Sequence, residues 1–172
     1  MATTIDPPAT LLNARELRAW RGMLRAHAAL CKALDAELEA AHGLQLSSYE
    51  VLMYLADAEQ ERMRMCDLAT TILLSRSGLT RLVDRLAREG LLERVACDDD
   101  ARGAFAKLTP TGREKLRQAR ATHLAGVHAM FLDRFAPEEL DRMGESWDRV
   151  LVGLGFTCCG LGGAAPKTIE AL

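Results

Sequence analysis

A single apolar stripe at helical spacing runs through the first quarter of the chain. The stripe comprises Leu17, Trp20, Leu24, His27, Leu30, Cys31, Leu34 and Leu38, most of which are three or four residues apart. This repeat predicts one long helix that begins near Leu11 and ends near Gly43, because glycine suits the left-handed conformation of a helix C-cap. A stripe of this length must be covered by other helices of the chain and, we expect, by a second copy.

Local start and stop signals predict the helices that follow. The segment Ser47-Ser48-Tyr49-Glu50 has the S-x-x-E pattern of a capping box at the start of a second helix. Ser75 is placed to be the N-cap of a further helix that Gly90 ends, and Thr109-Pro110 matches an N-cap followed by proline at the first helical position. We therefore expect helices over residues 47–57, 65–73, 76–89, 110–135 and 137–154.

Segments 91–97 and 104–108 show partial alternation of apolar and polar residues and are separated by turn-forming residues, which predicts a β-hairpin. Two helices joined by a tight turn and followed by a hairpin form a winged helix-turn-helix. The expected fold is mainly α with a small β-hairpin wing, and the aromatic content of 5% agrees with helices rather than a β-sandwich. The expected organisation is a flexible N-terminal arm (1–10), a helical dimerisation region (11–45 and 110–156), a winged helix-turn-helix DNA-binding domain (46–109) and a mobile C-terminal tail (157–172).

Charge is distributed unevenly along the chain. Residues 62–120 hold 13 Lys and Arg against 8 Asp and Glu, a balance of +5, whereas the remainder carries −7, so that the whole chain has a net charge of −2. A basic middle between acidic flanks indicates one surface that faces a polyanion.

Composition argues against several other classes of protein. The five cysteines, Cys31, Cys66, Cys97, Cys158 and Cys159, are an odd number without C-x-x-C spacing, which disfavours both a disulfide framework and a structural zinc site. Without an apolar run of membrane-spanning length or a signal-peptide pattern, we expect a cytoplasmic protein that needs no membrane. The residues suggest no nucleophile–base pair, phosphate loop or cofactor motif, so we do not expect an enzyme.

The helix expected over residues 76–89 separates apolar from polar side chains on a helical wheel. Leu79, Leu82, Val83 and Leu86 form the stripe expected to be buried, and the opposite side carries Ser77, Thr80, Arg81, Asp84, Arg85 and Arg88. Arginine can donate two hydrogen bonds to a guanine edge, and serine and threonine can bond bases or phosphates. Ser75 and Arg76 lie at the helix start, where free backbone N–H groups favour a phosphate. The alternative is an ordinary solvated face, in which Asp84 pairs with Arg81 or Arg88.

The segment from Asp100 to Gly112 has the form D-x-R-x5-L-T-x-x-G. Together with the segment SRSGLTRLVDRLAREGLLER at residues 75–94, it resembles the MarR family of bacterial transcriptional regulators, and the resemblance extends over residues 11–156. It implies a triangular homodimer that binds a pseudo-palindromic operator, most often as a repressor, with residues 75–89 as the recognition helix.

The resemblance also assigns roles within the wing. It implies that Arg102 contacts the minor groove or backbone of double-stranded DNA and that Asp100 holds Arg102 in place. A narrow minor groove attracts arginine through its enhanced negative potential. Lys107, on the second strand, can reach a phosphate or point into solvent.

Regulation can take either of two forms in the resembled family. Members bind small aromatic or phenolic ligands between the dimerisation helices and the DNA-binding lobe, and Trp20 with His27 could line such a site; the alternative is that Trp20 is a core or interface residue. Other members sense oxidants through cysteine, for which Cys97, Cys158 and Cys159 are candidates here. A further alternative is a protein-interaction module that has lost operator binding.

Overall fold

The structure is a computed structural model that describes residues 11–97 and 100–156, with the side chains of 11–96 and 104–156. Its elements in chain order are α1 (Ala14–His42), α2 (Leu46–Asp57), η1 (Glu59–Glu61), β1 (Arg62–Arg64), α3 (Met65–Thr71), α4 (Arg76–Arg88), β2 (Leu92–Cys97), β3 (Asp100–Leu108), α5 (Pro110–Met130), η2 (Leu132–Arg134) and α6 (Pro137–Gly153). The fold is mainly α-helical with a small antiparallel sheet, as the sequence predicts.

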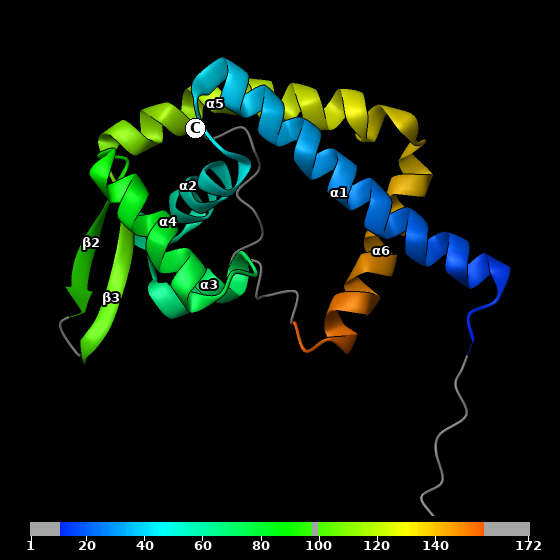
Figure 1. Ribbon diagram of the computed structural model, residues 1–172, viewed down its shortest axis with the longest axis horizontal. Helices are drawn as coiled ribbons and strands as arrows, with labels where there is room; N and C mark the ends of the chain where they lie inside the picture. The colour runs from blue at the N-terminus through cyan, green and yellow to red at the C-terminus, as the bar shows by residue number, and fades with distance from the viewer. Residues whose placement is uncertain (1–10, 98–99, 157–172) are drawn as a thin grey trace, which may run out of the picture.

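The elements form a winged lobe and a set of longer helices (Figure 1). The winged lobe consists of residues 46–109, in which α2, α3 and α4 pack beside a sheet of strand order β1-β3-β2. Helix α5 runs along the top of the view, α1 packs along it, and α6 descends from the end of α5 that lies away from the hairpin. Gly126 of α5 permits this close approach, because a side chain there would collide with Leu34 of α1.

Three predicted helix boundaries are confirmed, each by a local cap. Gly43 has a φ of 59°, the left-handed conformation, and ends α1. The Ser75 hydroxyl accepts a hydrogen bond from the Gly78 N–H at 3.1 Å and so caps α4. Thr109 caps α5 in the same way, accepting from the Gly112 N–H at 3.0 Å, with Pro110 at the first helical position.

The predicted capping box at Ser47-Ser48-Tyr49-Glu50 is wrong. Helix α2 begins at Leu46 after Gln45, whose side chain forms no capping hydrogen bond with the described residues. The cap comes instead from α1, because the Asp35 carboxylate accepts a hydrogen bond from the Leu46 N–H at 2.7 Å. Ser48 is thereby free to point into the core of the lobe.

The sheet also differs from the prediction. The three-residue strand β1 was not expected, and it pairs with β3 through Arg62 opposite Lys107 and Arg64 opposite Phe105. Strand β3 begins at Asp100, four residues before the predicted start, and its pairing with β2 is irregular at Ala96 and Cys97.

The hydrophobic core lies within the winged lobe and under α1 and α5. Its largest fully buried side chains include Leu38, Leu52, Leu55, Leu68, Leu79 and Leu86. Of the described α-helices, α6 stands apart, because none of its side chains is buried. None of the described helices is both long and apolar enough to cross a membrane.

Candidate nucleic-acid interface

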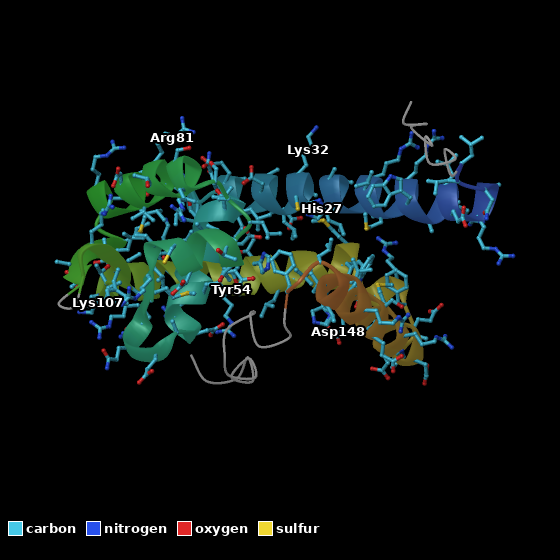
Figure 2. The ribbon with its side chains drawn as sticks, turned by 90° about the horizontal axis from the view of Figure 1, so that it is seen from below. His27, Lys32, Tyr54, Arg81, Lys107 and Asp148 are labelled. Carbon is cyan, nitrogen blue, oxygen red and sulfur yellow. The ribbon has the colours of Figure 1, made fainter. Side chains whose placement is uncertain are left out.

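Helix α4 packs one face into the winged lobe and leaves another open. Leu79, Leu82, Val83 and Leu86 are all buried, as the helical wheel predicts. Figure 2 shows Arg81 on the outer side of the lobe. The exposed polar side chains on and beside the helix include those of Ser75, Arg76, Ser77, Arg81 and Arg88. The helix therefore presents hydroxyls at its N-terminus and guanidiniums along its length over a fixed apolar base.

Thr80 and Asp84, also predicted on this face, are half-buried. The Thr80 hydroxyl donates to the Arg76 carbonyl at 2.9 Å within the helix. The Asp84 carboxylate forms an ion pair at 2.7 Å with Arg94 of β2, rather than with Arg81 or Arg88. The Arg88 Nε donates instead to the Asp84 backbone carbonyl at 3.3 Å. Asp84 therefore joins α4 to the wing.

Arg85 is also half-buried, although the helical wheel assigned it to the open face. Its Nη2 donates to the Ser48 hydroxyl of α2 at 2.9 Å. At about 100° per residue Arg85 lies only about 60° from Leu82, at the edge of the buried stripe. A side chain as long as arginine can turn inward from that position and cover apolar surface.

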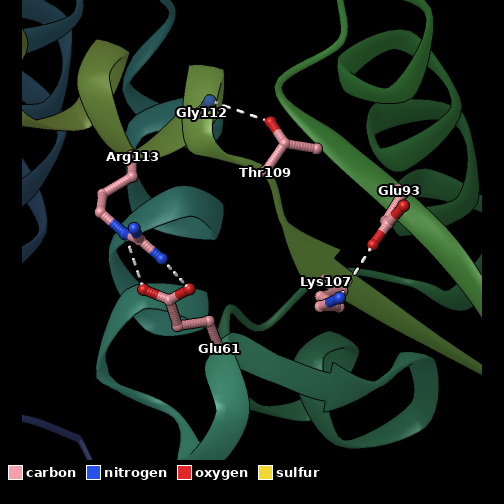
Figure 3. Close-up of polar contacts among 6 residues, drawn as sticks. All are labelled: Glu61, Glu93, Lys107, Thr109, Gly112 and Arg113. Atoms are coloured by element: carbon pink, nitrogen blue, oxygen red, sulfur yellow. Dashed lines mark hydrogen bonds and ion pairs between the residues drawn. The ribbon is translucent and has the colours of Figure 1, made fainter.

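The wing contributes one described candidate residue. Lys107 of β3 forms an ion pair at 3.1 Å with Glu93, its cross-strand neighbour on β2, and both side chains are about half exposed (Figure 3). Asp100 and Arg102 lie at the start of β3, with Asp100 opposite Cys97, but their side chains fall outside the described set. Lys107 is thus partly neutralised in the free protein.

Two arginines of β1 were not predicted as site candidates. The guanidiniums of Arg62 and Arg64 lie 4.9 Å and 5.5 Å from the ring centroid of Phe105, in the range of cation–π contact. They stand on the same sheet face as Lys107. Arg64 pairs with Phe105, which is five residues along β3 from Asp100, a distance of about 17 Å at about 3.4 Å per residue. The two arginines therefore lie well away from the predicted groove-contacting end of the wing.

The predicted ligand residues lie on an exposed part of α1. Trp20 is 53% exposed and His27 is exposed, with the His27 Nε2 3.5 Å from the Cys31 thiol. Glu50 of α2, which was not predicted, lies close enough to His27 for their charges to act on each other, and Tyr54 lies close to Glu50 in the same way. Burial raises the pKa of the Glu50 carboxyl, although His27 acts to lower it, and burial followed by the charge of Glu50 raises the pKa of Tyr54. His27 therefore has a carboxyl that readily holds a proton close to it, whereas the exposed indole of Trp20 lies seven residues, about 10 Å, nearer the start of α1.

The described cysteines are Cys31, which is half-buried, and Cys66, which is exposed. Burial, and then the charge of Glu50, raise the pKa of Cys31, so less of it is the reactive thiolate. The side chain of Cys97, and all of Cys158 and Cys159, lie outside the described residues. Among the described residues, no group of three or more His, Cys, Asp or Glu is arranged to hold a metal ion.

Comparison with known proteins identifies related chains. A MarR family model matches residues 42–103, which span α2 to the start of β3. The HTH-type transcriptional repressor YetL of Bacillus subtilis (strain 168) is 29% identical over 117 residues, which cover 66% of this chain and 70% of that protein.

Two solved structures from Streptomyces coelicolor are similar over almost their whole length. AbsC, a MarR family transcriptional regulator, superposes with a TM-score of 0.80 at 35% identity, covering 86% of this chain and 99% of that one. Sco3205, a MarR family transcriptional regulator solved in complex with DNA, superposes with a TM-score of 0.81 at 34% identity, covering 87% of this chain and 93% of that one.

Proposed function

The chain belongs to the MarR family of transcriptional regulators, and from this membership we propose that it represses transcription as a homodimer bound to a pseudo-palindromic operator. Two-fold symmetry of the protein requires two half-sites, with centres about one helical turn of DNA apart. Each protomer inserts α4 in the major groove and its wing in the adjacent minor groove.

The observation that carries this proposal is the division of α4 into a buried apolar face and an open basic face. Arg76, Ser77 and Arg81 are exposed near its N-terminus, while four apolar side chains anchor the helix in the lobe. Arginine and serine on a rigid helix of this kind can read base edges, and free backbone N–H groups at the helix start can hold a phosphate. The similar regulator Sco3205 forms a complex with DNA.

Apolar side chains on α1 and α6 support the homodimer. Exposed large apolar residues on these helices include Trp20, Leu24, Trp147, Val150 and Leu154. Trp147 is 42% exposed, and together with Val150 and the C-cap residue Leu154 it forms one apolar stripe along a helix that has no fully buried side chain. A second copy that covers both stripes removes this apolar surface from water and places the two α4 helices symmetrically.

In the wing, we assign Arg102 to the minor groove, Asp100 to the positioning of Arg102, and Lys107 to a backbone phosphate. Lys107 must then exchange its contact with Glu93 for the phosphate, which a half-exposed ion pair permits, because such pairs are weak in water.

Selection from a random DNA pool, followed by fluorescence anisotropy, tests the proposal. We expect a symmetric motif to be enriched and bound at about 10 nM or tighter, much more tightly than a shuffled duplex of equal composition at the same salt concentration. Equal affinity for both duplexes contradicts operator binding and favours the protein-interaction alternative. Sedimentation of the free protein tests the dimer directly.

A small aromatic or phenolic ligand is the effector that the surroundings of Trp20 favour. The indole of Trp20 offers a stacking surface, and about two helical turns along α1 His27, with the half-buried Glu50 close to it, offers polar partners. A redox effector receives less support from Cys31, because burial raises the pKa of its thiol. Quenching of tryptophan fluorescence by salicylate as a probe should disappear in Trp20→Phe, and quenching that persists assigns the signal to Trp147.

A further inference from the structure

We propose that Arg85 is a positioning residue of the recognition helix: by binding Ser48 of α2 it fixes the rotation of α4, and it does not read DNA itself. This inference rests on the proposed DNA-binding function. Its basis is the hydrogen bond of 2.9 Å from the Arg85 Nη2 to the Ser48 Oγ, which joins α4 to α2 across the winged lobe.

Ser48 is an unusual acceptor because it lies in the core. It is 2% exposed, and of the buried side chains in the described part of the chain it is the polar one. A buried hydroxyl without a partner is strongly unfavourable, whereas a charged donor gives it a short and strong hydrogen bond. The Ser48 hydroxyl therefore stabilises the inward conformation of Arg85, and Arg85 in turn satisfies the hydroxyl.

This hydrogen bond restrains the rotation of α4 about its own axis, which the apolar face of the helix does not do by itself. Burial of Leu79, Leu82, Val83 and Leu86 is non-directional, so it tolerates small rotations of the helix about its axis. A hydrogen bond weakens steeply when its angle changes, so it fixes the rotation. Because side chains reach about 6 Å from the helix axis, a rotation of about 20° moves their tips by about 2 Å, enough to misplace a base contact.

A second polar contact holds α4 from a different side. Asp84, the preceding residue, is ion-paired at 2.7 Å with Arg94 of β2. Successive residues point about 100° apart around a helix, so the two contacts restrain α4 toward α2 and toward the wing respectively. Of the two, the Arg85 contact is the less exposed, so solvent screens it less.

Helix α2 also touches α5 beside this contact. Tyr49 follows Ser48 directly, and its ring lies against His123 of α5 with 4.3 Å between centroids. The long helix α5 thus holds α2 in position, and the Arg85 contact in turn fixes α4 relative to α2. Arg85 therefore lies at the end of a chain of direct contacts that runs from α5 through α2 to the recognition helix.

A double-mutant cycle in the full-length protein tests the assignment. Ser48→Ala and Arg85→Met, which keeps the aliphatic stem, are combined, and binding to the selected operator and to a shuffled duplex is measured by anisotropy at several salt concentrations. We expect each single variant to lose roughly tenfold in operator affinity. The double variant should lose no more affinity than the single variant that binds the operator more weakly. Binding to the shuffled duplex and the salt slope should stay unchanged, because neither variant removes a phosphate contact.

A near-isosteric pair isolates the hydroxyl if the core tolerates these changes poorly. Ser48→Thr and Ser48→Val differ mainly in one hydroxyl, so the threonine variant should retain more operator discrimination than the valine variant. Both are compared under conditions where circular dichroism shows them folded.

Two results overturn the inference: additive losses in the cycle, or a loss confined to Arg85→Met with a salt slope lower by about one unit, which makes Arg85 a direct DNA contact. If the wild-type protein itself fails to prefer its selected DNA, the proposed function is wrong; if it does prefer it and the Ser48 variants match it, only this inference is wrong.

Discussion

Gly112, in the first turn of α5, lies against the backbone carbonyl of Leu91, which stands between α4 and β2. A Cβ at this position would overlap that carbonyl oxygen and approach the Leu108 side chain to 2.9 Å. Thr109 holds the contact in place, since its hydroxyl accepts a hydrogen bond from the Gly112 N–H (Figure 3). The same hydroxyl donates to the Gly90 carbonyl at 2.7 Å. Residues 109–112 are thus held against residues 90–91, which follow the end of α4.

Substitution of this glycine should therefore destabilise the protein. We expect Gly112→Ala to lower the free energy of unfolding by about 3 kcal/mol, because the obstacle is backbone that cannot move aside without shifting an element. The control is Gly22→Ala in α1, where a Cβ meets nothing within 4 Å; it should stabilise the helix by about 0.5–1 kcal/mol. Urea unfolding measures both, and similar values for the two variants would contradict the close contact.

The sequence predicted those features of the fold that depend on neighbouring residues. The caps at Gly43, Ser75 and Thr109 involve residues within four positions along the chain, so their patterns are visible in the sequence. The start of α2 was assigned wrongly because its cap, Asp35, comes from eleven residues away. Strand β1 was missed because three residues carry too little alternation, and the strand exists only by pairing with β3.

The same distinction applies to the candidate site. Periodicity placed Arg81 and Ser77 on the open face correctly, because side chains opposite a buried stripe point away from the core into solvent. It could not place Arg85 or Asp84, since residues at the edge of the stripe turn toward partners on other elements, here Ser48 and Arg94. The glycine of the L-T-x-x-G pattern was recognised from the family resemblance, but the reason for it is the Leu91 carbonyl.

Arg81 is the exposed arginine that we expect to read a base. Arg81→Ala should weaken binding to the selected operator by about 1–3 kcal/mol, and the loss should concentrate at particular base pairs when single-base variants of the operator are compared. Arg117→Ala is the matched control, because Arg117 pairs with Glu114 on α5. A loss that is equal on every sequence would make Arg81 a backbone contact.

Arg102 should behave differently, as a contact to the phosphates or the narrow minor groove. We expect Arg102→Ala to weaken binding to all duplexes and, if the contact is to phosphate, to reduce the slope of log affinity against log salt by roughly one unit. Arg134→Ala, on η2 after α5, provides a control for general loss of charge. Unchanged affinity at matched salt would remove the wing arginine from the proposed mechanism.

The apolar stripe of α6 should control assembly. Trp147→Glu places a charge among residues that we propose are covered by the second copy, so the variant should sediment as a monomer and lose most of its operator affinity. Arg149→Glu also introduces a glutamate but on the other side of α6, where the Arg149 guanidinium donates a hydrogen bond to Ser146 of its own helix. This control should remain dimeric. A dimeric Trp147→Glu protein would place the interface elsewhere.

The surroundings of His123 should make stability depend on pH. Burial lowers the pKa of its imidazole below the ordinary value of 6.5, and its Nδ1 has no hydrogen-bond partner among the described residues. Below pH 6.5 the imidazole of His123 becomes protonated in the unfolded chain but stays neutral in the folded protein. The free energy of unfolding therefore falls as the pH decreases from 6.5 toward the pKa of the folded state. Glu50, whose pKa burial raises, acts in the opposite direction, since the folded protein holds its proton more tightly than the unfolded chain does.

A variant that keeps the ring but cannot titrate separates these two contributions. His123→Phe preserves an aromatic contact with Tyr49 and leaves Glu50 in place, so the difference between the two proteins reports His123. We expect urea unfolding at pH 7.5 and pH 5.5 to show a smaller loss of stability on acidification in the variant than in the wild type. An equal loss in both would mean that the imidazole becomes protonated as readily in the folded protein as in the unfolded chain, and the contact between α2 and α5 would then be insensitive to protons.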